Sequence, residues 1–212
     1  MTRIAVLGGT GYAGRHIIAE AAERGHTVLS VARGIPGERV EGVTYIEGTL
    51  LDVPALAAEL EGVDVVVSAI APRGDMLGQV RPNLHALLSV LPESVRVGVI
   101  GGAGGSLVAE GGPRVIDSGF PDEFKPEAEE AIGILDDLQA DTTGRDWFFV
   151  HPAGGFGAWA PGERTGTYRI GGDVIVTDEA GESFISGADL AVAVLDEIEK
   201  PAHHRARFTV GY

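Results

Sequence analysis

The sequence predicts a single α/β domain built on a doubly wound parallel sheet with helices on both faces. Three observations predict this fold class. Strand patterns alternate with helical patterns along the chain, the apolar stretch at residues 63–72 is rich in β-branched residues, and a glycine-rich turn joins the first strand to the first helix. The 212 residues suffice to bury a substantial core, and no second domain is needed.

The apolar periodicity places each element along the chain. Strands are expected at residues 4–7, 26–33, 43–47, 63–72, 94–100, 146–152 and 207–212. Helices are expected at residues 13–24, 52–60, 82–91, 127–140 and 187–200, where apolar residues recur every three to four positions. Asp52 and Ser186 are the expected helix caps. Residues 167–176 have the pattern of a hairpin that turns at a glycine pair, within a small substrate-side excursion at about residues 153–186.

The turn after the first strand holds Gly8, Gly11 and Gly14 at three-residue spacing. Glycine permits backbone angles and close approaches that a side chain would block, and the helix that follows presents unpaired N–H groups and a positive dipole end. A pyrophosphate fits such a corner. The alternative is an ordinary tight turn, but the position between a strand and a helix at the start of the domain favours a dinucleotide site.

The second strand ends at Arg33. In a dinucleotide-binding sheet an acidic residue at this point would bond the ribose 2′-hydroxyl, whereas an arginine suits a 2′-phosphate. No Asp or Glu lies between Arg24 and Glu38, so the sequence favours NADP over NAD, which stays possible. The alternative is an arginine that only solvates a loop.

Two further stretches are expected beside the coenzyme. The turn at residues 49–51 would lie next to the adenine, where Leu50 and Leu51 either flank the ring or pack in the core. Residues 69–71, at the carboxyl end of the fourth strand, should border the coenzyme, because ligands of open α/β sheets lie beyond the strand ends.

Catalytic residues are not evident from the sequence. None of the four tyrosines has a lysine four residues on, the pair that carries proton transfer in the short-chain dehydrogenases. His151 stands at the end of the sixth strand and is a proton donor, a substrate contact or a bystander. The absence of cysteine excludes thiolate chemistry and disulfides, and no histidine cluster has metal-ligand spacing. Redox chemistry would therefore need a bound cofactor.

The charge and hydropathy of the chain limit its partners. A net charge of −15 argues against nucleic-acid binding, and no apolar stretch is long enough to cross a bilayer. The N-terminal apolar run ends at the glycine turn and does not resemble a signal region. We expect a cytoplasmic monomer or homodimer that binds no membrane and acts on a small-molecule acceptor.

The chain as a whole resembles a known family. The glycine turn at residues 8–14, the strand end at 31–33, residues 65–69, the glycines at 101–104, and the closing segments at 185–191 and 207–209 are together similar to the NAD(P)H-binding atypical short-chain dehydrogenases, which have the Rossmann fold. The nearest group within them is described as NADH-flavin reductases, related to biliverdin reductase B and more distantly to NmrA-like regulators.

This resemblance implies a set of coenzyme contacts. They are Gly8, Thr10, Gly11, Tyr12, Ala13, Arg33, Thr49, Leu50, Ala69, Ile70, Ala71, His151 and Pro152. Where biliverdin reductase B has a hydroxyl at the end of the fifth strand, this chain has Gly101 and Gly102, which argues against a serine-assisted reduction. The expected activity is NAD(P)H-dependent reduction of free flavin or a similar flat acceptor by direct hydride transfer. The alternatives are a non-catalytic NADP-sensing regulator and, with less support, a sugar-nucleotide epimerase or dehydratase.

Overall fold

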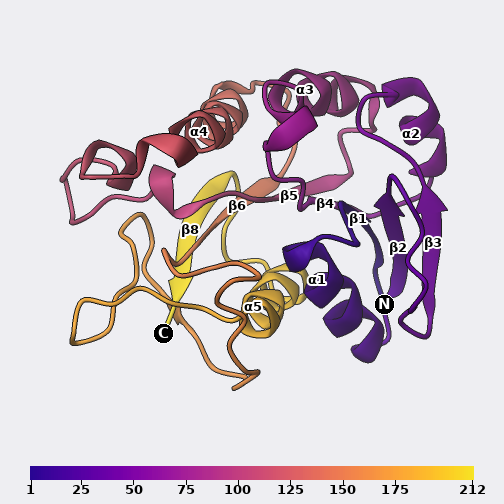
Figure 1. Cartoon of the computed structure of the whole chain (residues 1–212). Helices are drawn as coiled ribbons and strands as arrows, with labels where there is room; N and C mark the ends of the chain where they lie inside the picture. Colours follow the sequence, from indigo (N-terminus) through magenta and orange to yellow (C-terminus); the bar gives the residue numbers. More distant parts are fainter.

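The computed structural model describes residues 1–212 and confirms the predicted fold class (Figure 1). The strands are β1 (Arg3–Leu7), β2 (Thr27–Ala32), β3 (Val43–Glu47), β4 (Val65–Ser68), β5 (Arg96–Ile100), β6 (Trp147–Pro152), β7 (Arg169–Ile170) and β8 (Ala206–Gly211). They form one sheet of eight strands in the order β3-β2-β1-β4-β5-β6-β8-β7, in which only β7 is antiparallel to its neighbour.

Five helices cover both faces of the sheet. They are α1 (Tyr12–Glu23), α2 (Val53–Glu59), α3 (Val80–Val90), α4 (Lys125–Ala140) and α5 (Gly187–Glu199). Helices α1 and α5 lie together on one face, and α2, α3 and α4 lie along the other (Figure 1). Four short 3-10 turns complete the fold: η1 (Gly74–Met76), η2 (Ala103–Gly105), η3 (Val115–Asp117) and η4 (Asp122–Phe124). None of the helices combines the length and hydropathy needed to cross a bilayer.

The order of the strands reverses at β1. The chain runs outward from β1 to β2 and β3, then returns to build β4, β5, β6 and β8 on the other side of β1. In open α/β sheets such a reversal leaves a crevice outside the carboxyl ends of the central strands. The ends of β1 and β4 are therefore where the topology places a ligand.

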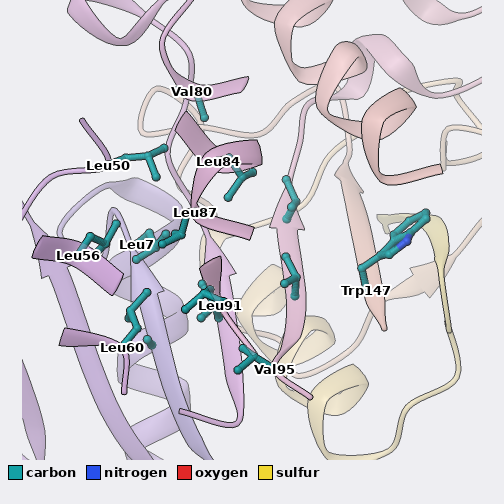
Figure 2. Packing of buried hydrophobic residues seen from close by; sticks show 14 of the residues in the cluster. Leu7, Leu50, Leu56, Leu60, Val80, Leu84, Leu87, Leu91, Val95 and Trp147 are labelled. Atoms are coloured by element: carbon teal, nitrogen blue, oxygen red, sulfur yellow. The ribbon is translucent and has the colours of Figure 1, made fainter. Parts of the chain in front are cut away.

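Two apolar layers hold the helices against the sheet. On one face, Leu7 and Leu50 pack with Leu56, Leu84 and Leu87 between the sheet and α2 and α3 (Figure 2). The second layer lies under α1 and α5. It contains apolar side chains from every second position of the strands, because successive side chains of a strand point to opposite faces of the sheet. Because both faces are covered, the central strands read as continuous apolar runs rather than as alternating ones.

The predicted helix caps are present. The Asp52 carboxylate accepts the Ala55 N–H at 3.2 Å, and the Ser186 hydroxyl oxygen accepts the Asp189 N–H at 3.0 Å. Gly25 follows α1 with a φ of +79°, a left-handed angle that costs a glycine little and ends the helix.

Residues 167–176 do not form the predicted hairpin. Arg169 and Ile170 instead pair antiparallel with Gly211 and Val210 of β8. The Gly171 N–H continues this pairing to the Thr209 carbonyl at 3.1 Å. The prediction was wrong because two short strand patterns around a glycine pair look like mutual partners, whereas here the free edge of β8 supplies the hydrogen bonds for one of them.

Candidate functional site

The glycine turn begins where β1 ends, at the centre of the sheet. Gly8 has a φ of +77°, and its N–H donates to the Val31 carbonyl of β2 at 2.8 Å. The Gly11 N–H then donates to the Gly8 carbonyl at 2.9 Å. These bonds fold the chain sharply back, so that α1 starts directly above the end of β1.

The turn is also packed too closely for side chains. A Cβ atom added to Gly14 would lie 2.1 Å from the Gly8 oxygen, and one added to Gly9 would lie 2.3 Å from Oγ of Ser30. Glycine therefore serves two purposes here: Gly8 supplies the left-handed angle, and Gly9 and Gly14 allow the backbone to close up.

The first turn of α1 leaves main-chain donors without partners. Gly11 is the N-cap and has no side chain to accept a hydrogen bond, and neither the Tyr12 nor the Ala13 N–H has an acceptor in the protein. Free amides and the positive end of the helix dipole together favour an anion at this position. Thr10 is exposed beside them. This corner fits a diphosphate.

The Tyr12 side chain, in contrast to its amide, is occupied. Its hydroxyl donates to the Pro161 carbonyl at 3.1 Å and accepts the Gly187 N–H at 3.1 Å. The ring also meets Phe156 edge to face, with 5.2 Å between centroids. Tyr12 thus ties the glycine turn to the start of α5 and to the segment after β6.

The end of β4 forms the opposite side of the turn. The Ala69 N–H donates to the Leu7 carbonyl at 2.9 Å, and a Cβ on Gly8 would meet the Ala69 oxygen at 3.0 Å and the Ile70 side chain at 3.1 Å. Ala71 follows and is exposed. Residues 69–71 therefore lie next to the glycine turn, and that they border the coenzyme stays a prediction.

Arg33 lies at the exposed end of β2, and its guanidinium donates to the carboxylate of Asp75. The sequence analysis did not identify Asp75, which comes from the turn after β4. No local signal pairs two residues 42 positions apart. The fold brings them together because β2 and β4 flank β1 on opposite sides.

The turn at residues 49–51 separates the two leucines. Leu50 is only 2% exposed and packs in the core, whereas Leu51 is 49% exposed. The Thr49 hydroxyl oxygen accepts the Leu51 N–H at 3.2 Å and so shapes the turn. For Leu50 the core-packing alternative agrees with the structure, because its side chain is directed into the apolar layer under α2.

His151 is enclosed at the end of β6. Its Nδ1 donates to the Gly102 carbonyl at 2.8 Å, which fixes the proton on that nitrogen, and its Nε2 is buried without a partner. Burial lowers the pKa of His151 to about 4, so the ring is neutral at physiological pH. The side chain is 1% exposed and its Nδ1 proton is bonded to the Gly102 carbonyl, an arrangement that favours the bystander interpretation over the proton donor. Pro152 follows it and is also buried.

The glycines after β5 make room for aromatic side chains. A Cβ on Gly101 would lie 2.2 Å from the Phe149 ring, and one on Gly105 would lie 2.6 Å from Cε1 of His151. Gly102 has open space around the position of a Cβ. A glycine cluster at a strand end indicates that the backbone lies close to a neighbouring group. For Gly101 and Gly105 those neighbours are side chains of β6.

The hydroxyls of Tyr168 and Tyr212 donate to carboxylates. The Tyr168 hydroxyl donates to Asp196 at 2.7 Å, and that of Tyr212 donates to the carboxylate of Asp189. Burial and these carboxylates raise the pKa of both phenols. Neither tyrosine is an available acid or base at neutral pH.

The comparison with known proteins identifies the family. A family model described as NAD(P)H-binding matches residues 8–201. The chain belongs to this family. The family binds nicotinamide coenzymes, and the curated relatives that this chain matches include isoflavone reductase homologues.

Three similar proteins illustrate the range of the family. YwnB of Bacillus subtilis, an uncharacterised protein, is 37% identical, with 98% of this chain and 97% of YwnB covered. A proposed NADH-flavin reductase of Streptococcus pneumoniae is 33% identical with a TM-score of 0.86, covering 100% of this chain and 99% of that one. A proposed epimerase of Bacteroides thetaiotaomicron is 31% identical with a TM-score of 0.87, covering 100% and 97%. The reactions assigned to these two solved relatives differ.

Proposed function

We propose that this protein is an NADPH-dependent reductase that reduces free flavin or a similar flat acceptor by direct hydride transfer. The observation that carries the proposal is how the candidate proton donors are held: His151 is enclosed and neutral, and the hydroxyls of Tyr12, Tyr168 and Tyr212 each donate to an acceptor within the protein. Reduction of an electron-poor ring system needs no such donor, because the accompanying proton can come from solvent.

The glycine turn supports the coenzyme half of the proposal. The amides of Tyr12 and Ala13 would hold the diphosphate, and Arg33 would meet a 2′-phosphate. Residues 69–71 would border the nicotinamide side. The bound, reduced coenzyme supplies the hydride, and the protein's own task is to orient the two rings and exclude water.

The segment after β6 supports the acceptor half. Phe156 packs against Tyr12, and Trp159 on the same segment is 75% exposed. A large exposed aromatic ring is suited to stacking on another flat ring. Together these residues favour a planar acceptor over a flexible sugar nucleotide.

To test the reductase activity, the purified protein is mixed with NADPH and FMN, and the oxidation of NADPH is followed by its absorbance. Oxidation of NADPH that depends on both protein and FMN supports the reductase. Binding of NADPH without oxidation contradicts it and supports the sensing regulator, which the same arrangement of candidate proton donors also allows.

The coenzyme preference is tested with Arg33→Asp. Losing a charge-assisted contact to the 2′-phosphate should weaken NADPH binding relative to NADH by about 10- to 100-fold. Arg39→Asp, the same charge change in the exposed loop after β2, is the matched control. If the ratio of NADPH to NADH affinity were unchanged in Arg33→Asp, Arg33 would not be the contact of the 2′-phosphate.

A further inference from the structure

The Arg33–Asp75 ion pair spans the carboxyl end of β1. Arg33 follows β2, Asp75 follows β4, and β1 lies between these two strands in the sheet. The glycine turn begins at the same place. The group proposed to recognise the 2′-phosphate is therefore already bound to a carboxylate of this chain.

The main chain at Asp75 is held in place. Asp75 sits in η1, where the Met76 N–H donates to the Arg73 carbonyl at 3.1 Å. The Met76 side chain is 5% exposed and belongs to the apolar layer under α2 and α3. The short Asp75 side chain is itself 67% exposed, so its carboxylate can turn but stays within reach of this anchored backbone.

The two sides of η1 are also fastened to α4. Arg73 donates to Glu127 at 2.5 Å, before the turn. After it, the Arg81 N–H donates to Glu130 at 2.9 Å, and the Gly78 N–H donates to the same carboxylate. Residues 73–81 are thus connected to the body of the domain on both sides of Asp75.

Arg33 has the longer reach of the two side chains. The Arg33 side chain is 58% exposed, the Asp75 side chain is 67% exposed, and each is the other's only side-chain hydrogen-bonding partner. A long exposed arginine side chain can reorient at little cost. When the pair breaks, the guanidinium can swing several ångströms away, whereas the short Asp75 side chain stays near its anchored main chain.

We propose that Asp75 is a specificity-determining residue. Its carboxylate competes with the 2′-phosphate of NADPH for Arg33 and so reduces the preference for NADPH over NADH. The inference rests on the proposed binding of the coenzyme at the glycine turn. NADPH must displace the carboxylate and then lies near a like charge, whereas NADH carries a hydroxyl there and leaves the pair intact.

The size of the effect follows from the exposure of the pair. Exposed ion pairs are weak, and releasing Arg33 from one corresponds to a change in affinity of about 2- to 5-fold. Asp75→Asn should therefore strengthen NADPH binding by at least about 2-fold while NADH binding stays the same. The gain should shrink as salt is added, because screening weakens both the pair and the repulsion.

The experiment is calorimetric titration of the full chain with NADPH and with NADH. It compares wild type, Asp75→Asn and the control Glu61→Gln, which removes the same charge at an exposed position outside any ion pair. Arg33→Ala is titrated with and without Asp75→Asn, and the gain should be smaller where Arg33 is absent. Thermal unfolding confirms that each variant is folded.

A higher NADPH-to-NADH affinity ratio in Asp75→Asn, but not in Glu61→Gln, supports the inference. An unchanged or lower affinity ratio in Asp75→Asn overturns the inference. The proposed function survives this result as long as the wild-type protein binds the coenzyme. An equal rise in Glu61→Gln also overturns the inference, since net charge would then be the cause. If wild type binds neither coenzyme, the proposed function fails and the inference with it.

Discussion

Gly14→Ala is the substitution that most directly tests the close packing of the glycine turn. In an exposed helix interior, replacing glycine by alanine stabilises a helix by about 1 kcal/mol. Here the added Cβ would lie 2.1 Å from the Gly8 oxygen and 2.7 Å from the Gly9 Cα, both of them backbone atoms that cannot rotate away. The expected sign is therefore reversed.

The magnitude follows from the overlap. Non-bonded heavy atoms prefer separations of about 3.5 Å, so α1 would have to move away from the turn by more than about 1 Å. Overpacking of this kind costs about 1–3 kcal/mol, partly offset by the helix propensity of alanine. We expect a melting temperature about 2–8 °C lower, given about 2–4 °C per kcal/mol for a domain of this size. Displacing the free amides of Tyr12 and Ala13 should also weaken coenzyme binding about 10- to 100-fold.

The assay combines thermal unfolding with a coenzyme titration. Gly37→Ala is the matched control, because Gly37 has open space where its Cβ would be and no left-handed backbone angle. It should leave both measurements unchanged. If Gly14→Ala were as stable as wild type and bound the coenzyme equally well, the close approach of α1 to β1 would not be what builds the site.

Three further predictions concern His151, Arg145 and Gly101. Burial lowers the pKa of His151 from 6.5 to about 4, so the unfolded chain takes up a proton first and stability should fall by up to about 3 kcal/mol as pH drops from 6.5 to 4. Urea unfolding measured at several pH values in this range should show that the free energy of unfolding depends less on pH in His151→Gln than in wild type. An equal pH dependence in the two proteins would refute the lowered pKa of His151. Arg145 is buried and donates to four main-chain carbonyls around the end of α3, so Arg145→Met should cost about 2–4 kcal/mol in denaturant unfolding, and a loss below about 0.5 kcal/mol would argue against that role. Gly101→Ala should destabilise by about 1–3 kcal/mol through contact with Phe149, whereas Gly102→Ala should be nearly neutral in the same unfolding assay; equal effects would mean that the ring is free to move.

The fold was largely predictable because its signals are local. The β-branched run of β4, the periodic apolar residues of α5 and the caps Asp52 and Ser186 each act within a few residues of the element they define. β7 was not predictable in the same way. Its partner β8 lies some 40 residues further along the chain, and periodicity in one segment carries no information about which edge it will join.

The site was predictable to a similar extent. The glycine turn and the position of residues 69–71 beside it follow from the strand–turn–helix pattern and from the rule for strand ends. The burial of His151 was not evident, because a polar residue at a strand end reads the same whether its side chain faces a ligand or a neighbouring backbone. Asp75 could not be identified from the sequence for a different reason: its proposed role depends on a tertiary contact with Arg33.

The central claim is that the main-chain amides at the start of α1 bind the diphosphate of a nicotinamide coenzyme. An NMR titration of 15N-labelled protein with NADP⁺ tests it directly. We expect the amide signals of Tyr12 and Ala13 to shift in a saturable manner, at the same concentrations at which the coenzyme binds. Saturable binding that leaves these two signals in place would contradict the claim.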